Sequence, residues 1–202
     1  SIFPLISYAS NTDSSGINLS RNWIFVNVTV TEVNFANITF RLYNTTSNVN
    51  TTTFTTQTFS LNFTSLSDGF YTFNVTVVDT ASNSNVTATR GVRVDTTMPA
   101  VTLVQPQNIT YNINMSLSVN YTVGDINLQA CWWAIDGGAN TTITCGQNAS
   151  VNVSQGSHTV RVYANDSAGN VNGSSSVTFF SDSVFPLIDY AGDADASGAN
   201  LS

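Results

Sequence analysis

Asparagine is the residue whose type and spacing in this sequence point most directly to chemistry. The pattern Asn-x-Ser/Thr, with x not proline, accepts N-linked glycans on exterior proteins. It occurs at 17 of the 25 asparagines, more than twice its chance frequency for this content of serine and threonine. The sites are Asn18, Asn27, Asn37, Asn44, Asn50, Asn62, Asn74, Asn85, Asn108, Asn114, Asn120, Asn140, Asn148, Asn152, Asn165, Asn172 and Asn200. We therefore expect extensive N-glycosylation.

Strand patterning is an alternative origin of these motifs. In "NVTVT", Asn27 and Thr29 would share the outward face of a strand while Val28 points inward. An outward face of Asn, Ser and Thr generates the motif without any glycan, and the two explanations are compatible. Only 8% of the residues are charged, so the surface has little electrostatic repulsion against self-association. A glycan coat would block the pairing of exposed strand edges.

The two cysteines, Cys131 and Cys145, bracket a segment that is typical of a hairpin, with its turn near residues 136–138. Cysteines on facing strands pair in an oxidising exterior, and closing a loop of about 15 residues contributes about 3 kcal/mol. Two free buried thiols are the alternative. Zinc is not supported, because it requires four nitrogen or sulfur ligands and only His158 is left to help.

A possible calcium loop lies near the end of the chain, in the segment "DADASG". Asp193 and Asp195 stand at alternate positions before a turn glycine, as in the opening of a calcium-binding loop. The counterpart "NTDSSG" keeps Asp13, but asparagine stands where a full loop needs its bidentate glutamate. Asp95 and Asp182, at two junctions, could supplement such a site. A plain Asx-type turn is the preferred interpretation, with calcium as the alternative.

Groups for acid–base catalysis are scarce. The chain has one histidine, His158, and one glutamate, Glu32, and it shows no nucleophile elbow or phosphate-binding loop. We predict His158 to be a face residue of a strand and the protein not to be an enzyme. A net charge of −7 argues against a nucleic-acid or anionic-membrane partner. No stretch approaches 18 apolar residues, so we expect no membrane segment in this sequence.

The elements that must position these residues are strands. Polar and apolar residues alternate in Trp23–Glu32, Ser116–Val123 and His158–Asn165. Such alternation places one face in a core and the other in water. No window shows a sustained helical period, and short Gly-, Asp- and Ser-rich turns separate the alternating segments. The pattern predicts an all-β sandwich.

Two internal repeats set the domain organisation. Residues 79–99 match residues 166–186 without a gap, in the pattern strand, "D-x-A-x-N" turn, last strand, Asp then Pro. Residues 183–202 match residues 1–20, with 13 of 20 positions identical. We therefore predict domain one at 1–95, domain two at 96–182, and the first strand region of a further copy of domain one at 183–202. This arrangement is typical of a segment of a tandem array.

Four motifs carry a resemblance to a known family. They are "YTFNVTVVDTASN" (71–83), "HTVRVYANDSAGN" (158–170), "VDTTMPAVTLVQP" (94–106) and "QACWWAIDGGANTTITC" (129–145). These segments resemble the immunoglobulin-like repeats of archaeal and bacterial cell-surface proteins. The resemblance implies two Greek-key sandwiches of about seven strands each, in series on the cell exterior. It also implies a structural role in a stalk, a filament or a surface layer, without catalysis.

These observations lead to one expected function and two alternatives. We expect a structural subunit of an extracellular, heavily N-glycosylated filament or surface stalk. Its partners would be copies of itself arranged head to tail, either in one polypeptide or by addition of a strand such as Phe3–Ala9 to a neighbouring sheet. The first alternative is an adhesin that binds a ligand through loops such as "DGGAN" near Trp132. The second is a spacer within a larger surface enzyme.

Overall fold

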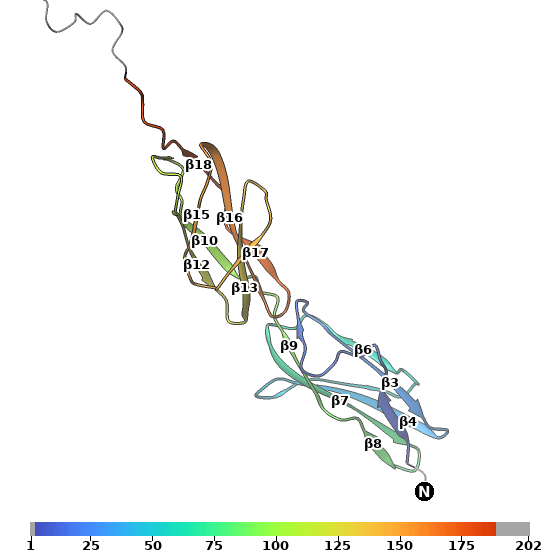
Figure 1. The fold of residues 1–202 in the computed structure, drawn as a ribbon. Coiled ribbons are helices and arrows are strands. Elements are labelled where there is room, and N and C mark those ends of the chain that lie inside the picture. The colour runs from blue at the N-terminus through green and yellow to red at the C-terminus, as the bar shows by residue number, and fades with distance from the viewer. Residues whose placement is uncertain (1–2, 189–202) are drawn as a thin grey trace, which may run out of the picture.

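The computed structural model describes residues 3–188, and it shows two elongated units placed end to end (Figure 1). Both units consist of strands and turns, so the predicted all-β fold is confirmed. The strands of the first unit, domain one, are β1 (Leu5–Tyr8), β2 (Asn18–Leu19), β3 (Ile24–Thr31), β4 (Phe35–Tyr43), β5 (Asn48–Phe54), β6 (Ser60–Phe63), β7 (Gly69–Asp79), β8 (Ser84–Val86) and β9 (Arg90–Val94). The strands of the second unit, domain two, are β10 (Ala100–Gln105), β11 (Thr110–Tyr111), β12 (Leu117–Gly124), β13 (Leu128–Ile135), β14 (Thr141–Ile143), β15 (Ala149–Val151), β16 (Gly156–Asp166), β17 (Val171–Gly173) and β18 (Val177–Ser181).

Each domain is a sandwich of two sheets with the same strand order. In domain one, β1, β3 and β6 form one sheet, and β2, β9, β7, β4 and β5 form the other, with β8 paired to β7. Domain two repeats this order with β10, β12 and β15 facing β11, β18, β16, β13 and β14. Strands β2 and β8, and their equivalents β11 and β17, come in addition to the seven strands per domain that the resemblance implies.

The cores follow the two-residue period of the sequence. On β7, alternate residues from Tyr71 to Val77 are buried, and on β16 the same holds for Val160, Val162 and Ala164. In domain one, these side chains pack against residues from the facing sheet, such as Val26 of β3. Valine and aromatic side chains suit this pleated, half-buried surface, and their burial is the main stabilising contribution of each sandwich.

Candidate functional site

The joint between the domains holds a network of polar contacts. β9 ends at Val94 and β10 begins at Ala100, so the link is short. Its first part is tied to domain one. The backbone N–H of Asp95 donates to the carbonyl of Leu19 over 2.9 Å, and the Asp68 carboxylate accepts from the Thr96 N–H and the Thr97 hydroxyl over 2.9 and 2.7 Å. The link is therefore a continuation of domain one and not a free tether.

Asparagines of domain two bind the same link from the other side. Asn127 Nδ2 donates to Asp95 Oδ2 over 2.5 Å. Asn170 Nδ2 donates to the Asp95 carbonyl over 2.7 Å, and Asn172 Nδ2 donates to the Pro99 carbonyl over 2.9 Å. Asp95 is only 3% exposed, so these bonds are shielded from water. Together they set the orientation of one domain on the other.

Asp166 orients the asparagine that reaches across. Its Oδ1 accepts from the N–H groups of Ala168 and Asn170 over 2.9 Å each, and its Oδ2 accepts from Asn170 Nδ2 over 2.7 Å. This is the "D-x-A-x-N" turn of the sequence. In domain one, Asp79 makes the same turn, and the hydrogen bond from the Asn83 side chain is the main cause of a pKa of Asp79 below the ordinary value.

Three carboxylates meet at the joint. Oxygens of Asp95, Asp125 and Asp166 all lie within 4.8 Å of one another, and Asp166 is fully buried. Within residues 3–188, no arginine forms an ion pair with any of the three. Carboxylate and amide oxygens are the ligands that Ca²⁺ takes in proteins, so these are the described residues that could hold a cation. The alternative to a bound cation is a joint held by hydrogen bonds, in which the side-chain N–H groups of Asn127 and Asn170 donate to this cluster.

Asp13, which we considered for the alternative calcium loop, is not part of this group. Asp13 accepts from Arg21 over 2.5 Å and from the backbone N–H of Phe25 over 2.7 Å, so both of its oxygens have protein partners. Asp193 and Asp195 lie outside the described residues. Asp95, which we considered only as a supplement to such a loop, is instead the centre of the interdomain contacts.

His158 forms an arrangement that resembles a catalytic triad. Its Nδ1 lies 2.7 Å from Asp136 Oδ2, and its Nε2 lies 3.4 Å from the Ser154 hydroxyl. However, Nε2 also lies 2.9 Å from the Ser154 carbonyl, and a carbonyl accepts only from a protonated nitrogen. The imidazole is therefore a donor on both sides and not a general base for Ser154. His158 lies on strand β16, and the structure shows that it belongs to the buried face of that strand, with 7% of the residue exposed.

We predict that titration of His158 reports this contact. The hydrogen bond to Asp136 raises the pKa of His158 above its ordinary value of 6.5, against the effect of burial. Partial burial raises the pKa of Asp136, but the hydrogen bonds from His158 and Thr159 outweigh it and hold that pKa below 3.8. The contribution of His158 to stability is therefore complete below pH 6.5 and is lost as the pH rises through the raised pKa. The contribution of Asp136 is lost as the pH falls through its lowered pKa.

An NMR titration of the single histidine measures the effect. We expect a pKa above 6.5 in the native protein and a lower value in Asp136→Asn. Asp125→Asn is the matched control, because Asp125 lies at the joint and not at His158. A histidine that titrates at the same pH in Asp136→Asn and in the native protein would contradict the assignment.

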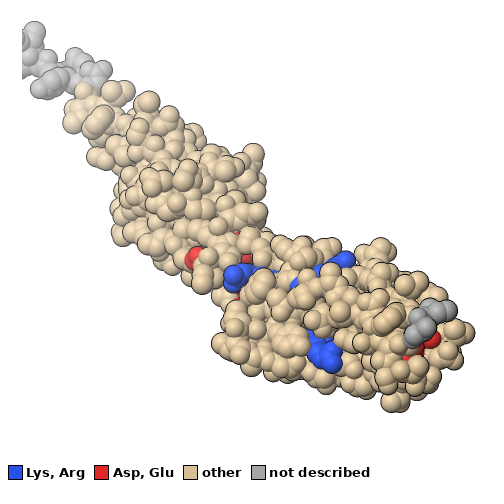
Figure 2. All heavy atoms as spheres, turned by 90° about the horizontal axis from the view of Figure 1, so that it is seen from below, with Lys and Arg blue, Asp and Glu red and all other residues tan. Residues whose placement is uncertain are grey.

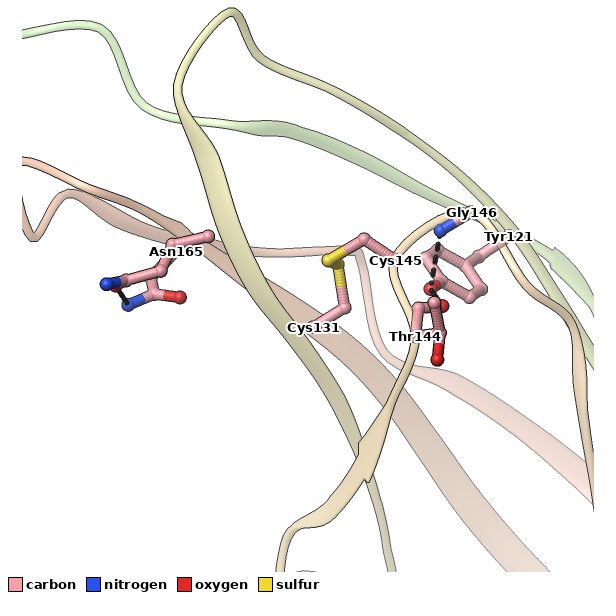
Figure 3. Close-up of a disulfide and its surroundings, with 7 residues drawn as sticks. Tyr121, Cys131, Thr144, Cys145, Gly146 and Asn165 are labelled. Carbon is pink, nitrogen blue, oxygen red and sulfur yellow. Dashed lines mark hydrogen bonds between the residues drawn. A yellow bond between two sulfur atoms is a disulfide. The ribbon is translucent and has the colours of Figure 1, made fainter.

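The predicted disulfide is present in the structure. Cys131 on β13 and Cys145, just after β14, are bonded, and their Cα atoms lie 5.1 Å apart. Figure 3 shows the hydroxyl of Tyr121 beside the bridge, where it donates to the Thr144 carbonyl and accepts from the Gly146 N–H. The segment that follows β14 is thus held to the core by the bridge and by Tyr121.

The structure separates the glycan candidates by exposure. None of the sixteen motif asparagines among the described residues is buried, and Asn200 lies outside that part of the chain. Asn27 and Thr29 flank the buried Val28, as strand alternation requires. Seven of the sixteen are exposed, and in the described structure their side-chain nitrogens donate to no other residue. These seven are Asn44, Asn50, Asn62, Asn108, Asn140, Asn148 and Asn152.

The exposed motif asparagines gather at sheet edges. Asn50 lies on β5 and Asn62 on β6, both at the edge of a sheet. Asn140 precedes the edge strand β14, while Asn148 and Asn152 flank the edge strand β15. By contrast, Asn85 and Asn172 donate their Nδ2 to backbone carbonyls, and Asn165 donates to Gln129. The sequence motif does not separate these two groups, because the difference depends on pairing partners that are distant in the chain.

The rest of the surface carries few charges. The face shown in Figure 2 has small groups of arginine and acidic residues on an otherwise uncharged surface. Trp132, half-buried, stacks on Tyr163 with ring centroids 5.7 Å apart, so it does not project from the hairpin. Within residues 3–188, no helix is long and apolar enough to cross a membrane.

Comparisons with known proteins agree with this fold. No family model and no curated protein sequence matches the chain. Among solved structures, the fibronectin(III)-like modules of CbhA from Clostridium thermocellum match 93% of this chain over 100% of theirs, with 17% identity and a TM-score of 0.50. A marsupial T cell receptor matches 89% of this chain over 73% of its own, with 9% identity and a TM-score of 0.55. The likeness shows the fold, a tandem of immunoglobulin-like or fibronectin-III-like sandwiches.

Proposed function

We propose that this chain is a structural segment of an extracellular, N-glycosylated filament or stalk built from tandem immunoglobulin-like domains. The observation that carries the proposal is the position of the exposed motif asparagines, five of which lie on or beside edge strands. The disulfide is consistent with an exterior location, because such bonds persist in oxidising compartments.

Glycans at these positions would solve a physical problem of the fold. An edge strand presents unpaired N–H and C=O groups to any other strand, and soluble proteins often protect such edges with charged side chains. Strands β5 and β14 contain no charged residue, and β5 is threonine-rich and largely exposed. A bulky hydrated glycan beside each edge excludes an approaching strand by its volume. The same coat keeps a surface of low charge from associating with itself.

The joint supports a mechanical role. Two sandwiches in line, linked by five residues that bond to both domains, form an extended unit with a defined orientation (Figure 1). The observed pairing of β1 with β3 of its own domain places the first strand inside domain one. Continuity through joints of this kind is therefore a simpler route to a fibre than strand addition by that segment.

We predict that glycopeptide mapping of the protein from its native source finds glycans at the seven exposed asparagines named above. Occupancy should be lower at Asn85, Asn165 and Asn172, because each donates its Nδ2 to another group in the folded domain. These three sites carry the same sequence motif and serve as internal controls. Unmodified asparagine at most of the seven exposed sites would refute the glycosylated part of the proposal.

The adhesin alternative has less support in the structure. It requires an exposed aromatic group near the hairpin of "DGGAN", but Trp132 is half-buried and stacks on Tyr163. The spacer alternative depends on domains outside this sequence. Electron microscopy of native particles tests both, because a filament shows a longitudinal repeat set by two sandwich domains.

A further inference from the structure

Domain one has an open groove on one side, between the edge strands of its two sheets. The groove runs between β5 and β6, each of which is the edge strand of its own sheet. Two adjoining hollows of about 260 and 420 Å³ form it, and Val49 and Leu66 line both of them. Leu42 and Leu61 add to the apolar lining, and Val49 is 41% exposed. We call this groove the seam, and its size is that of a small-molecule site.

Asn50 points into the seam. On β5 it lies opposite Leu42 of β4, and side chains that face each other across two strands share one side of the sheet. Leu42 is fully buried, so Asn50 lies on the core side of β5, and its exposure comes from the open seam that it lines. The Thr52 hydroxyl of the same motif donates to Asn50 Oδ1 over 2.7 Å, and Asn50 Nδ2 donates to none of the described residues. A glycan on Nδ2 therefore starts inside the seam.

Asn62, on the other wall, points away from the core. It lies opposite Phe25 of β3, whereas the next residue, Phe63, lies opposite the buried Ile24. Residues alternate between the two faces along a strand, so Asn62 belongs to the outer face of β6 and borders the hollow from outside. Two copies of the same motif at one edge thus differ in the direction of their side chains.

Domain two closes the equivalent place with its own side chains. With the same offset as the repeat of 79–99 and 166–186, His158 corresponds to Tyr71 and Ser154 to Ser67. Both rings bond to the serine carbonyl, Tyr71 from its hydroxyl and His158 from Nε2, over 2.9 Å each. His158 also donates from Nδ1 to Asp136, in the turn between β13 and β14, over 2.7 Å. The imidazole thus ties the hairpin of one sheet to the segment that follows β15 in the other.

In domain one, the same place is a hollow. The Tyr71 hydroxyl reaches the Ser67 carbonyl, and the residue lines the larger of the two hollows. The turn between β4 and β5 bonds to itself, since Asn44 Oδ1 accepts from the N–H groups of residues 46 and 47 over 2.9 and 2.8 Å. The seam is therefore open where domain two is closed, and the motif of Asn50 stands at this opening.

We propose that the seam of domain one binds the first sugars of the glycan that Asn50 carries, and that this glycan closes the edge of domain one as His158 closes that of domain two. A sugar ring presents C–H groups on its faces and hydroxyl groups around its edge. The C–H groups pack on Val49, Leu61 and Leu66, which removes apolar surface from water, while the hydroxyls stay hydrated. This inference rests on the proposed glycosylation and adds to it a binding site for the sugar.

Removal of glycans from the folded chain tests the site. The 202-residue chain, secreted from a host that attaches oligomannose glycans with N-acetylglucosamine as the first sugar, provides the probe. A peptide N-glycosidase cleaves each glycan at its asparagine, and mass spectrometry follows every site with time. We expect release from Asn50 to be about tenfold slower than release from Asn62, which is the effect of shielding about 50 Å² of apolar surface. After denaturation, the two rates should be equal.

A substitution in the wall of the seam shows whether contact with the sugar is the cause. Val49→Ser removes apolar surface next to Asn50 and leaves the motif intact. Release from Asn50 should become about threefold faster, while release from Asn62 stays the same. Val104→Ser is the matched control, because Val104 has a similar exposure of 47% but lies on β10 of domain two. It should leave both rates unchanged.

Hydrogen exchange tests whether the bound sugar closes the edge. In the glycosylated chain, Asn50→Gln should make amides of β5 and β6 exchange about tenfold faster, and Asn62→Gln should change them by less than about twofold. In the chain produced without glycans, Asn50→Gln should have no effect, because the protection comes from the sugar and not from the asparagine side chain. Amides of β14 and β15 provide the reference in domain two.

The outcomes separate this inference from the proposed function. Equal release from Asn50 and Asn62 in the folded chain, or an unmodified Asn50 beside an occupied Asn62, would overturn the sugar site. Glycans found in the native protein together with equal release would remove this inference and leave the glycosylated structural role. Slow release from Asn50 that depends on Val49, found with unmodified asparagines in the native protein, would support the seam as a sugar site and refute the glycan coat.

Discussion

Replacing Cys131 and Cys145 together with alanine lowers the free energy of unfolding of domain two by about 3 kcal/mol and leaves domain one unchanged. The bridge closes a loop with a sequence separation of 14, and a cross-link of that length restricts the unfolded chain by about this amount. Cys131 is fully buried, so the lost sulfur also removes packing in the core of domain two. Domain one has no cysteine and provides an internal reference.

Hydrogen exchange measured by mass spectrometry resolves the two domains in one experiment. Amides of β13 and β16 should exchange about 100-fold faster in the double variant, which is the factor that corresponds to about 3 kcal/mol. Amides of β4 and β7 should exchange at the native rate. The bonds of Tyr121 to residues 144 and 146 persist in the variant, so the fold is retained. Equal acceleration in both domains would contradict independent cores, and a change below about 1 kcal/mol would contradict the role of the bridge.

Features that depend on neighbouring residues could be predicted from the sequence. The two-residue alternation of Trp23–Glu32 became β3, with Ile24, Val26 and Val28 buried. The hairpin around residues 136–138 and the cysteine pair that it brings together were also confirmed, because the turn and both cysteines lie within 15 residues. The all-β sandwich follows from many such local patterns that agree.

For His158, the local pattern predicted a strand but not a partner for the ring. The residue has the same parity on its strand as Val160 and Val162, so it belongs to the buried face. We predicted a face residue because His158 lies in an alternating segment with no cysteine or activated-serine pattern nearby. The partner, Asp136, lies 22 positions away, in the turn of the hairpin between β13 and β14. The alternation of β16 already indicated that His158 points into the core. A buried polar ring needs a hydrogen-bond partner, so a partner could have been expected.

The joint could not be predicted because its contacts are distant in the chain. Asp95 meets residues 32 and 75 positions away, and one asparagine looks like another in a chain with 25 of them. The gapless repeat marked Asp95 and Asp182 as equivalent, but not which groups would bind them. The exposure of each motif asparagine could not be predicted either, because it depends on the order of the strands in the sheets.

Phe40→Ala should give the largest loss of stability, about 3–5 kcal/mol, and it should affect domain one. Phe40 is fully buried on β4 and packs edge to face on Phe54 of β5, with ring centroids 6.1 Å apart. The neighbouring core residue Ile38 faces Phe54 in the strand register, as Cys131 faces Ile143 in domain two. Domain one thus uses aromatic packing where domain two uses the disulfide.

Chemical denaturation with hydrogen exchange as the readout tests this difference. In Phe40→Ala, amides of β4 and β7 should lose protection while those of β13 and β16 keep it, the reverse of the cysteine variant. Phe70→Ala is the matched control, because Phe70 is 42% exposed on β7 and its loss leaves no cavity in the core. A comparable loss in both phenylalanine variants would contradict the assigned core. If Phe40→Ala also loosens domain two, the joint couples the stability of the two sandwiches as well as their orientation.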